Sequence, residues 1–169
     1  MEQSAEFNPD AIELRTTIET AMARADVERR STPNPVTGGV DKMTEVLDLP
    51  TAEGQLMVGR TYGDYPGETI LHVRVPGAIG PNAAMDSNGN AAGYLDVRLR
   101  GDGTPEAFNF LSSDATDGQS ILDADRLKAS VSLALSALGR ALEANPAPVP
   151  RKNRLAAALG KLLHFRKKL

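Results

Sequence analysis

The spacing of apolar side chains along this chain of 169 residues changes from helical to alternating and then back to helical. Near the N-terminus, apolar residues recur every three or four positions, at Ala11, Leu14, Ile18, Ala21, Met22 and Ala25. This spacing buries one face of a helix. Asn8, Pro9 and Asp10 supply an N-cap, a first-turn proline and an acid at the positive end of the helix dipole. A first helix is therefore predicted, followed by a loop over residues 31–41.

The middle of the chain consists of short segments separated by turn residues, a rhythm typical of antiparallel strands. We place strands at residues 43–49, 55–61, 69–75, 94–100 and 106–111. In the third and fourth of these, apolar and polar residues alternate. Leu71, Val73, Val75, Leu95, Val97 and Leu99 share one face, and His72, Arg74, Tyr94, Asp96 and Arg98 share the other. This alternation predicts a sheet with one buried face.

A second helical pattern begins after Ser120, with a broad apolar stripe at Leu127, Val131, Ala134, Leu135, Leu138, Ala141 and Leu142. Asn145 and Pro146 supply its stop. The fold class expected is α+β: an antiparallel sheet of about five strands with the N- and C-terminal helices on one face. Residues 1–145 form a single domain in this interpretation, residues 146–150 a proline-rich hinge, and residues 151–169 a separate helical tail.

The tail is basic and amphipathic when placed on a helical wheel. Its apolar arc holds Leu155, Ala158, Leu159, Leu162, Leu163, Phe165 and Leu169, and the opposite arc holds Arg154, Lys161, His164, Lys167 and Lys168. The tail has seven Lys or Arg and no acidic residue, whereas the rest of the chain carries a net charge of −10. This contrast predicts a docking element with an acidic or anionic counterpart.

The tail has four candidate binding counterparts. Docking on its own body or self-association fits best, and a groove on a partner protein comes second. An anionic membrane surface would accept both the leucine arc and the charges. Nucleic acid fits least well, because it makes no use of large apolar side chains on one face.

The polar face of the sheet is the candidate partner-binding surface, through His72, Arg74, Tyr94, Asp96 and Arg98. Such a cluster can bind an acidic peptide or an anion. The plainer alternative is a solvated face on which Asp96 pairs with an arginine across strands. An enzyme using His72 as a base oriented by Asp96 is a third class of function.

Composition and motifs narrow the choice further. The chain has no cysteine and only two histidines, which excludes cysteine-based and histidine-rich metal sites. Asp86-x-Asn88-x-Asn90 begins like a calcium loop, but Ala91 and Val97 stand where that motif needs glycine and glutamate. Asp114, Asp117, Asp123 and Asp125 are interpreted as turn and capping residues, and Tyr62 to Gly67 as a hairpin loop.

The function expected is a non-enzymatic adaptor or accessory protein that binds a partner protein or itself, with no cofactor, metal or small-molecule substrate. The acidic N-terminus and the lack of a spanning apolar run indicate a cytoplasmic location, with peripheral membrane association as an alternative. Over residues 9–144, the leading helix, strand-rich middle and leucine-rich late helix resemble type III secretion chaperones. That resemblance implies an effector-binding role, although those chaperones place a helix between strands.

Overall fold

The computed structural model describes residues 8–33, 40–62, 69–77, 93–110 and 119–148. Within these ranges the chain forms two helices and seven strands: α1 (Pro9–Met22), β1 (Glu28–Pro33), β2 (Val40–Thr51), β3 (Gly54–Tyr62), β4 (Thr69–Pro76), β5 (Tyr94–Leu99), β6 (Pro105–Phe110), β7 (Gln119–Ser120) and α2 (Ala124–Ala144). Every strand pairs antiparallel with the next one along the chain. The α+β class is therefore confirmed.

Both helices begin at the capping residues that the sequence indicates. The side chain of Asn8 accepts hydrogen bonds from the backbone N–H groups of Asp10 and Ala11, at 3.1 and 3.3 Å. The side chain of Asp123 accepts one from the N–H of Arg126 at 2.9 Å. Each cap satisfies donors that have no partner inside the helix, and this fixes where the helix starts.

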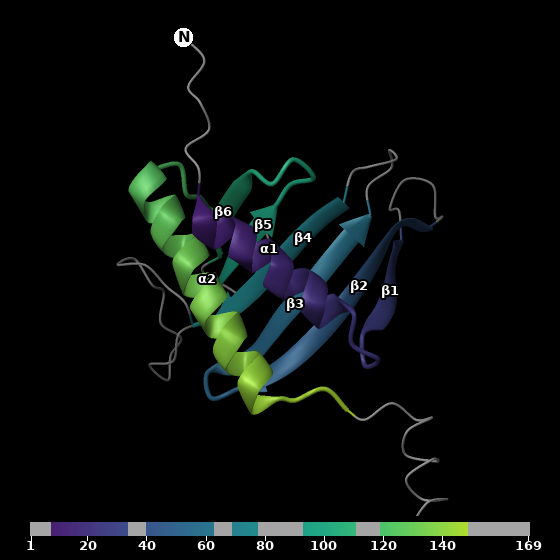
Figure 1. Cartoon of the computed structure of the whole chain (residues 1–169). Coiled ribbons are helices and arrows are strands. Elements are labelled where there is room, and N and C mark those ends of the chain that lie inside the picture. The colour runs from purple at the N-terminus through teal and green to yellow at the C-terminus, as the bar shows by residue number, and fades with distance from the viewer. Residues whose placement is uncertain (1–7, 34–39, 63–68, 78–92, 111–118, 149–169) are drawn as a thin grey trace, which may run out of the picture.

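The two helices pack against each other and against one face of the sheet (Figure 1). The residues between them are the apolar alternates of the strands together with one stripe of each helix. Eight of these side chains are 0 % exposed: Leu14, Ile18, Val58, Val73, Val97, Val131, Ala134 and Leu138. Burial of apolar surface stabilises the fold by roughly 25 cal/mol per Å², so this single layer of side chains holds helices and sheet together.

The strand count differs from the expectation of about five. Residues 31–41 were predicted as a loop, but Glu28–Pro33 form β1, paired with β2 from Glu28 opposite Val46. β1 has no apolar alternation, and it is stabilised by backbone pairing and by the ion pair of Arg30 with Asp48 at 2.7 Å. The two-residue β7 was also missed, because so short a strand has no period.

The start of the proline-rich segment is tied to the body. Asn145, the C-cap of α2, donates through Nδ2 to the carbonyl of Pro50 at 2.9 Å. Arg24 donates to the carbonyl of Asn145 at 2.7 Å and to that of Pro146 at 3.4 Å. The chain therefore leaves α2 in a defined direction as far as Pro148, the last described residue. The tail of residues 151–169 lies outside the described residues.

Truncation of Leu138 should measure how much the layer between helices and sheet contributes. Leu138 is 0 % exposed, so Leu138→Ala should lower the free energy of unfolding by about 2–5 kcal/mol. Leu133 lies on the same helix at 43 % exposure and is the matched control, with an expected loss below about 1 kcal/mol for Leu133→Ala. Urea unfolding measures both, and equal losses would contradict the assigned faces.

Candidate binding site on the sheet face

The register of β4 and β5 gathers the five polar residues named above on the face that the helices leave uncovered (Figure 1). Arg74 lies directly opposite Asp96, and His72 lies opposite Arg98. Tyr94 lies one pair further along, opposite Pro76. We call His72, Arg74, Tyr94, Asp96 and Arg98 the sheet-face cluster.

Asp96 is the centre of the sheet-face cluster and is 0 % exposed. Its Oδ2 accepts hydrogen bonds from Nε of Arg74 at 3.3 Å and from Nη2 of Arg98 at 3.2 Å. Its Oδ1 has no hydrogen-bond partner among the described residues. One buried carboxylate is thus shared by two guanidinium groups that are each 36 % exposed, so these three side chains carry a local charge of +1.

Aromatic rings support both arginines. The guanidinium carbon of Arg74 lies 5.0 Å from the ring centroid of Tyr94, and that of Arg98 lies 4.7 Å from the centroid of Phe108. The Tyr94 ring in turn stacks on Phe110, with centroids 4.7 Å apart. Cation–π contacts hold each guanidinium by roughly 0.5–1 kcal/mol at exposed sites, so both groups are oriented before any ligand arrives.

Phe108 and Phe110 were not among the predicted site residues. They lie opposite Asp96 and Tyr94 in the β5–β6 pairing, and therefore on the sheet-face cluster's side. The alternation of β6 indicates that the two phenylalanines share a face. Hydrophobicity alone would assign that face to the core, whereas the helices cover the face of Ala107.

His72 differs from the rest of the sheet-face cluster because it is only 8 % exposed. Its ring lies against Gly59, where any added Cβ would clash with it, and its Nε2 is 3.3 Å from the hydroxyl of Thr61. Burial is the main cause that lowers the pKa of His72 to about 4, and the charges of Arg74 and Arg98 lower it further against the opposing effect of Asp96. His72 is therefore neutral at pH 7 and turned away from solvent.

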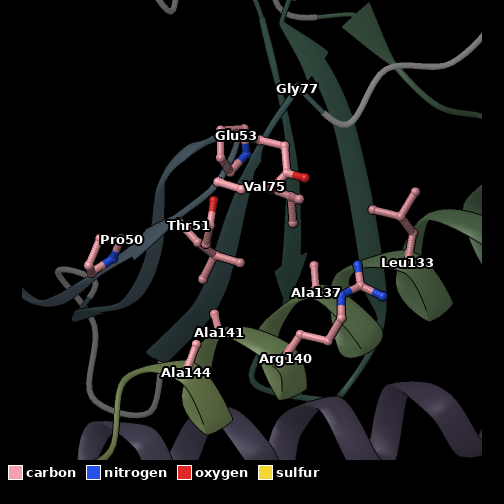
Figure 2. A pocket seen from close by; sticks show the side chains of 13 residues that line it. Pro50, Thr51, Glu53, Val75, Gly77, Leu133, Ala137, Arg140, Ala141 and Ala144 are labelled. Atoms are coloured by element: carbon pink, nitrogen blue, oxygen red, sulfur yellow. The ribbon is translucent and has the colours of Figure 1, made fainter.

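A separate groove opens beside α2, as Figure 2 shows. We call this cavity of about 450 Å³ the α2 groove. It lies between the second half of the helix, the β2–β3 turn and the end of β4. Its lining is Pro50, Thr51, Ala52, Glu53, Leu56, Val75, Pro76, Gly77, Leu133, Ala137, Arg140, Ala141 and Ala144. In the sequence, the α2 groove corresponds to a row of small residues on α2. That pattern is also typical of ordinary helix packing.

Within the described ranges, no group of three or more His, Asp or Glu side chains could hold a metal ion. Neither described helix is long and apolar enough to cross a membrane. The calcium-like segment at residues 86–90 and every residue of the tail lie outside the description. In the predicted hairpin loop of Tyr62 to Gly67, the hydroxyl of Tyr62 donates a hydrogen bond to the carboxylate of Glu45 at 2.8 Å.

Comparisons with protein-family models, with curated proteins and with solved structures find no match. The function of the chain is therefore inferred from its own geometry.

The lowered pKa of His72 predicts a pH dependence of stability. Below about pH 6.5 the unfolded chain binds a proton on His72 that the folded protein does not bind until about pH 4. The free energy of unfolding should therefore fall between these values by up to about 3 kcal/mol. Urea unfolding at a series of pH values measures this slope.

His72→Gln is the control for this slope, because the variant cannot titrate at that position. Its unfolding free energy should change less between pH 6.5 and pH 4 than that of the parent chain. Asp26, whose pKa is lowered from 3.8 by its hydrogen bond from Arg24, contributes only below this window. Parallel slopes for parent and variant would contradict the assignment.

Proposed function

We propose that the chain is a non-enzymatic binding protein that holds an acidic segment of a partner protein against the sheet-face cluster. The observation that carries the proposal is the sharing of one buried carboxylate oxygen by Arg74 and Arg98. These two cations and one anion carry a local charge of +1, although the chain as a whole is acidic.

The donor inventory supports an anionic ligand. A guanidinium carries five N–H donors in a rigid planar fork that matches a carboxylate. Among the described residues, Arg74 and Arg98 each donate one hydrogen bond, in both cases to Asp96. Both side chains are 36 % exposed, so the donors that bind no described residue would be able to meet carboxylates of a partner.

The spacing of the two arginines supports an extended peptide as the ligand. Arg74 and Arg98 are diagonal neighbours on adjacent strands, which places them roughly 7–8 Å apart. Alternate residues of an extended chain are about 6.6 Å apart. Acidic residues at alternate positions of a partner segment would therefore each meet one arginine, and Phe108 and Tyr94 would flank them.

The state of His72 supports binding rather than catalysis on this face. Its Nε2 contacts Thr61, its side chain is 8 % exposed, and no hydrogen bond joins it to Asp96 among the described residues. A general base must reach the proton that it abstracts. A substrate lying on the arginines would not reach this imidazole.

Arginine replacement tests the binding proposal. A fluorescein-labelled ten-residue peptide with glutamate at alternate positions should bind the full chain at low salt, as fluorescence anisotropy measures. Arg74→Gln and Arg98→Gln should each weaken binding about tenfold, because each removes charge-assisted hydrogen bonds. Added salt should weaken binding further.

Two controls accompany this measurement. Arg30 lies on the same face of the sheet, at 51 % exposure, and is paired with Glu28 and Asp48. Arg30→Gln should leave the affinity unchanged, and a peptide with glutamine in place of glutamate should not bind. The proposal fails if Arg30→Gln weakens binding as much as Arg74→Gln does.

The α2 groove favours a second role, as the docking place of the chain's own tail, residues 151–169. Its walls are largely apolar, which suits the arc of Leu155, Leu159 and Leu162. Ala144 lines the groove, and the described chain ends four residues later at Pro148, so the tail starts within reach of it. The tail's seven cations also complement a body of net charge −10.

A spin label tests this docking, and the absence of native cysteine allows labelling at one position. A nitroxide on Lys161→Cys lies on the polar arc and leaves the leucines intact. It should broaden the amide signals of Leu133 and Ala137 in the full chain. Ala137→Glu should remove the broadening, whereas Ser136→Glu, at an exposed position on the same helix, should keep it.

Mixing experiments identify the occupant of the groove. Nitroxide-labelled chains without ¹⁵N are mixed with ¹⁵N-labelled chains that carry no nitroxide. The signals of the ¹⁵N-labelled chains broaden in this mixture only if the tail of one copy docks on another copy. Docking within one chain predicts none in the mixture. Broadening that is unchanged in the Ala137→Glu variant would contradict this role. So would a tail that binds anionic vesicles and does not bind the α2 groove.

A further inference from the structure

Three arginines from distant parts of the chain surround a small hollow on the other side of the sheet from the sheet-face cluster. The hollow has a volume of about 180 Å³. Its lining includes Arg15 and Glu19 of α1, Arg60 of β3, Thr69 of β4, and Arg100 and Gly101 after β5. We call it the arginine hollow.

The charges that line the arginine hollow do not cancel. Arg15 pairs with Glu19 at 3.3 Å, Arg60 with Glu45 at 3.5 Å, and Arg100 with Glu106. Of these three carboxylates, only that of Glu19 lines the hollow. Each of these ion pairs involves one nitrogen of its guanidinium, so among the described residues most donors of the three arginines have no acceptor in an ion pair.

Arg60 is placed where β3 otherwise carries core residues. It follows Leu56 and Val58 at alternate positions, and it lies opposite Leu71 of β4 and Glu45 of β2. Its Nε is buried and has no hydrogen-bond partner among the described residues. The rest of the Arg60 side chain is 27 % exposed and lines the hollow, so a ligand there would meet the outer part of the guanidinium and not the buried Nε.

The turn that carries Arg100 and Gly101 is fixed by its own hydrogen bonds. The N–H of Arg100 donates to the carbonyl of Thr104 at 3.1 Å, and the N–H of Gly103 donates to the carbonyl of Arg100 at 2.9 Å. Gly103 adopts a φ of 87°, which favours glycine. The third side of the hollow is therefore held in place.

We propose that the arginine hollow binds a small phosphate-type oxyanion, either inorganic phosphate or the terminal group of a small phosphomonoester. Guanidinium forks match phosphate oxygens in pairs, and the hydroxyl of Thr69 adds a further donor. The volume of about 180 Å³ equals that of about six water molecules. That volume accommodates a phosphate group and a few further atoms.

Titration of the full chain with sodium phosphate at constant ionic strength tests this proposal. The melting temperature should rise and then saturate, because a ligand that binds only the folded state stabilises it. Arg60→Gln, Arg15→Gln and Arg100→Gln should each weaken binding about tenfold. Arg15 and Arg100 are 46 % and 59 % exposed, so their variants should fold even if Arg60→Gln does not.

Controls separate this hollow from the rest of the molecule and identify the source of the phosphate. Arg30→Gln should leave phosphate binding unchanged, since Arg30 lies on the other face and is paired with Glu28 and Asp48. Glycerol 3-phosphate binding at least as tightly as inorganic phosphate would assign the hollow to phosphomonoesters, and weaker binding would assign it to the free ion. The proposal is overturned if neither compound shows saturable binding, or if Arg15→Gln and Arg100→Gln bind as the parent does.

Discussion

The register between β4 and β5 is the constraint on which both the core and the candidate site depend. Val73 lies opposite Val97 on the face covered by the helices, so Arg74 must lie opposite Asp96 on the other face. A slip of one residue would exchange the faces, turning the arginines toward Val131 and Leu138 and the valines toward solvent. The apolar layer thus selects the register, and the register assembles the charged cluster as its consequence.

The burial of Asp96 explains why the sheet-face cluster is ordered. A carboxylate that is 0 % exposed needs positive partners, and Arg74 and Arg98 supply them through a single oxygen. The arginines remain 36 % exposed, and aromatic rings support both of them. At physiological salt the field of the acidic body is screened beyond about 8 Å. The proposed acidic segment would therefore respond chiefly to Arg74 and Arg98.

Local patterns in the sequence predict much of this structure. The alternation around residues 71–75 and 94–99 predicts both strands and which of their residues share a face, and Asn8 and Asp123 mark the helix starts. β1 is not predicted, because Glu28–Pro33 has no apolar alternation and is stabilised by its backbone pairing with β2. The burial of the His72 and Asp96 side chains is also not predicted, because nothing in their spacing shows that neighbours cover them. The arginine hollow joins Arg15, Arg60 and Arg100, which only the folded chain brings together.

We propose that the face opposite the helices is the binding surface, through Arg74 and Arg98. The most direct measurement is a map of backbone amide shifts in the full ¹⁵N-labelled chain during titration with the alternating glutamate peptide. If the peptide binds the sheet-face cluster, the largest shifts should fall in β4, β5 and β6, around Arg74, Asp96 and Phe108, and α1 and α2 should shift little. Shifts confined to the helices or to the arginine hollow, with β4 and β5 unchanged, would contradict it.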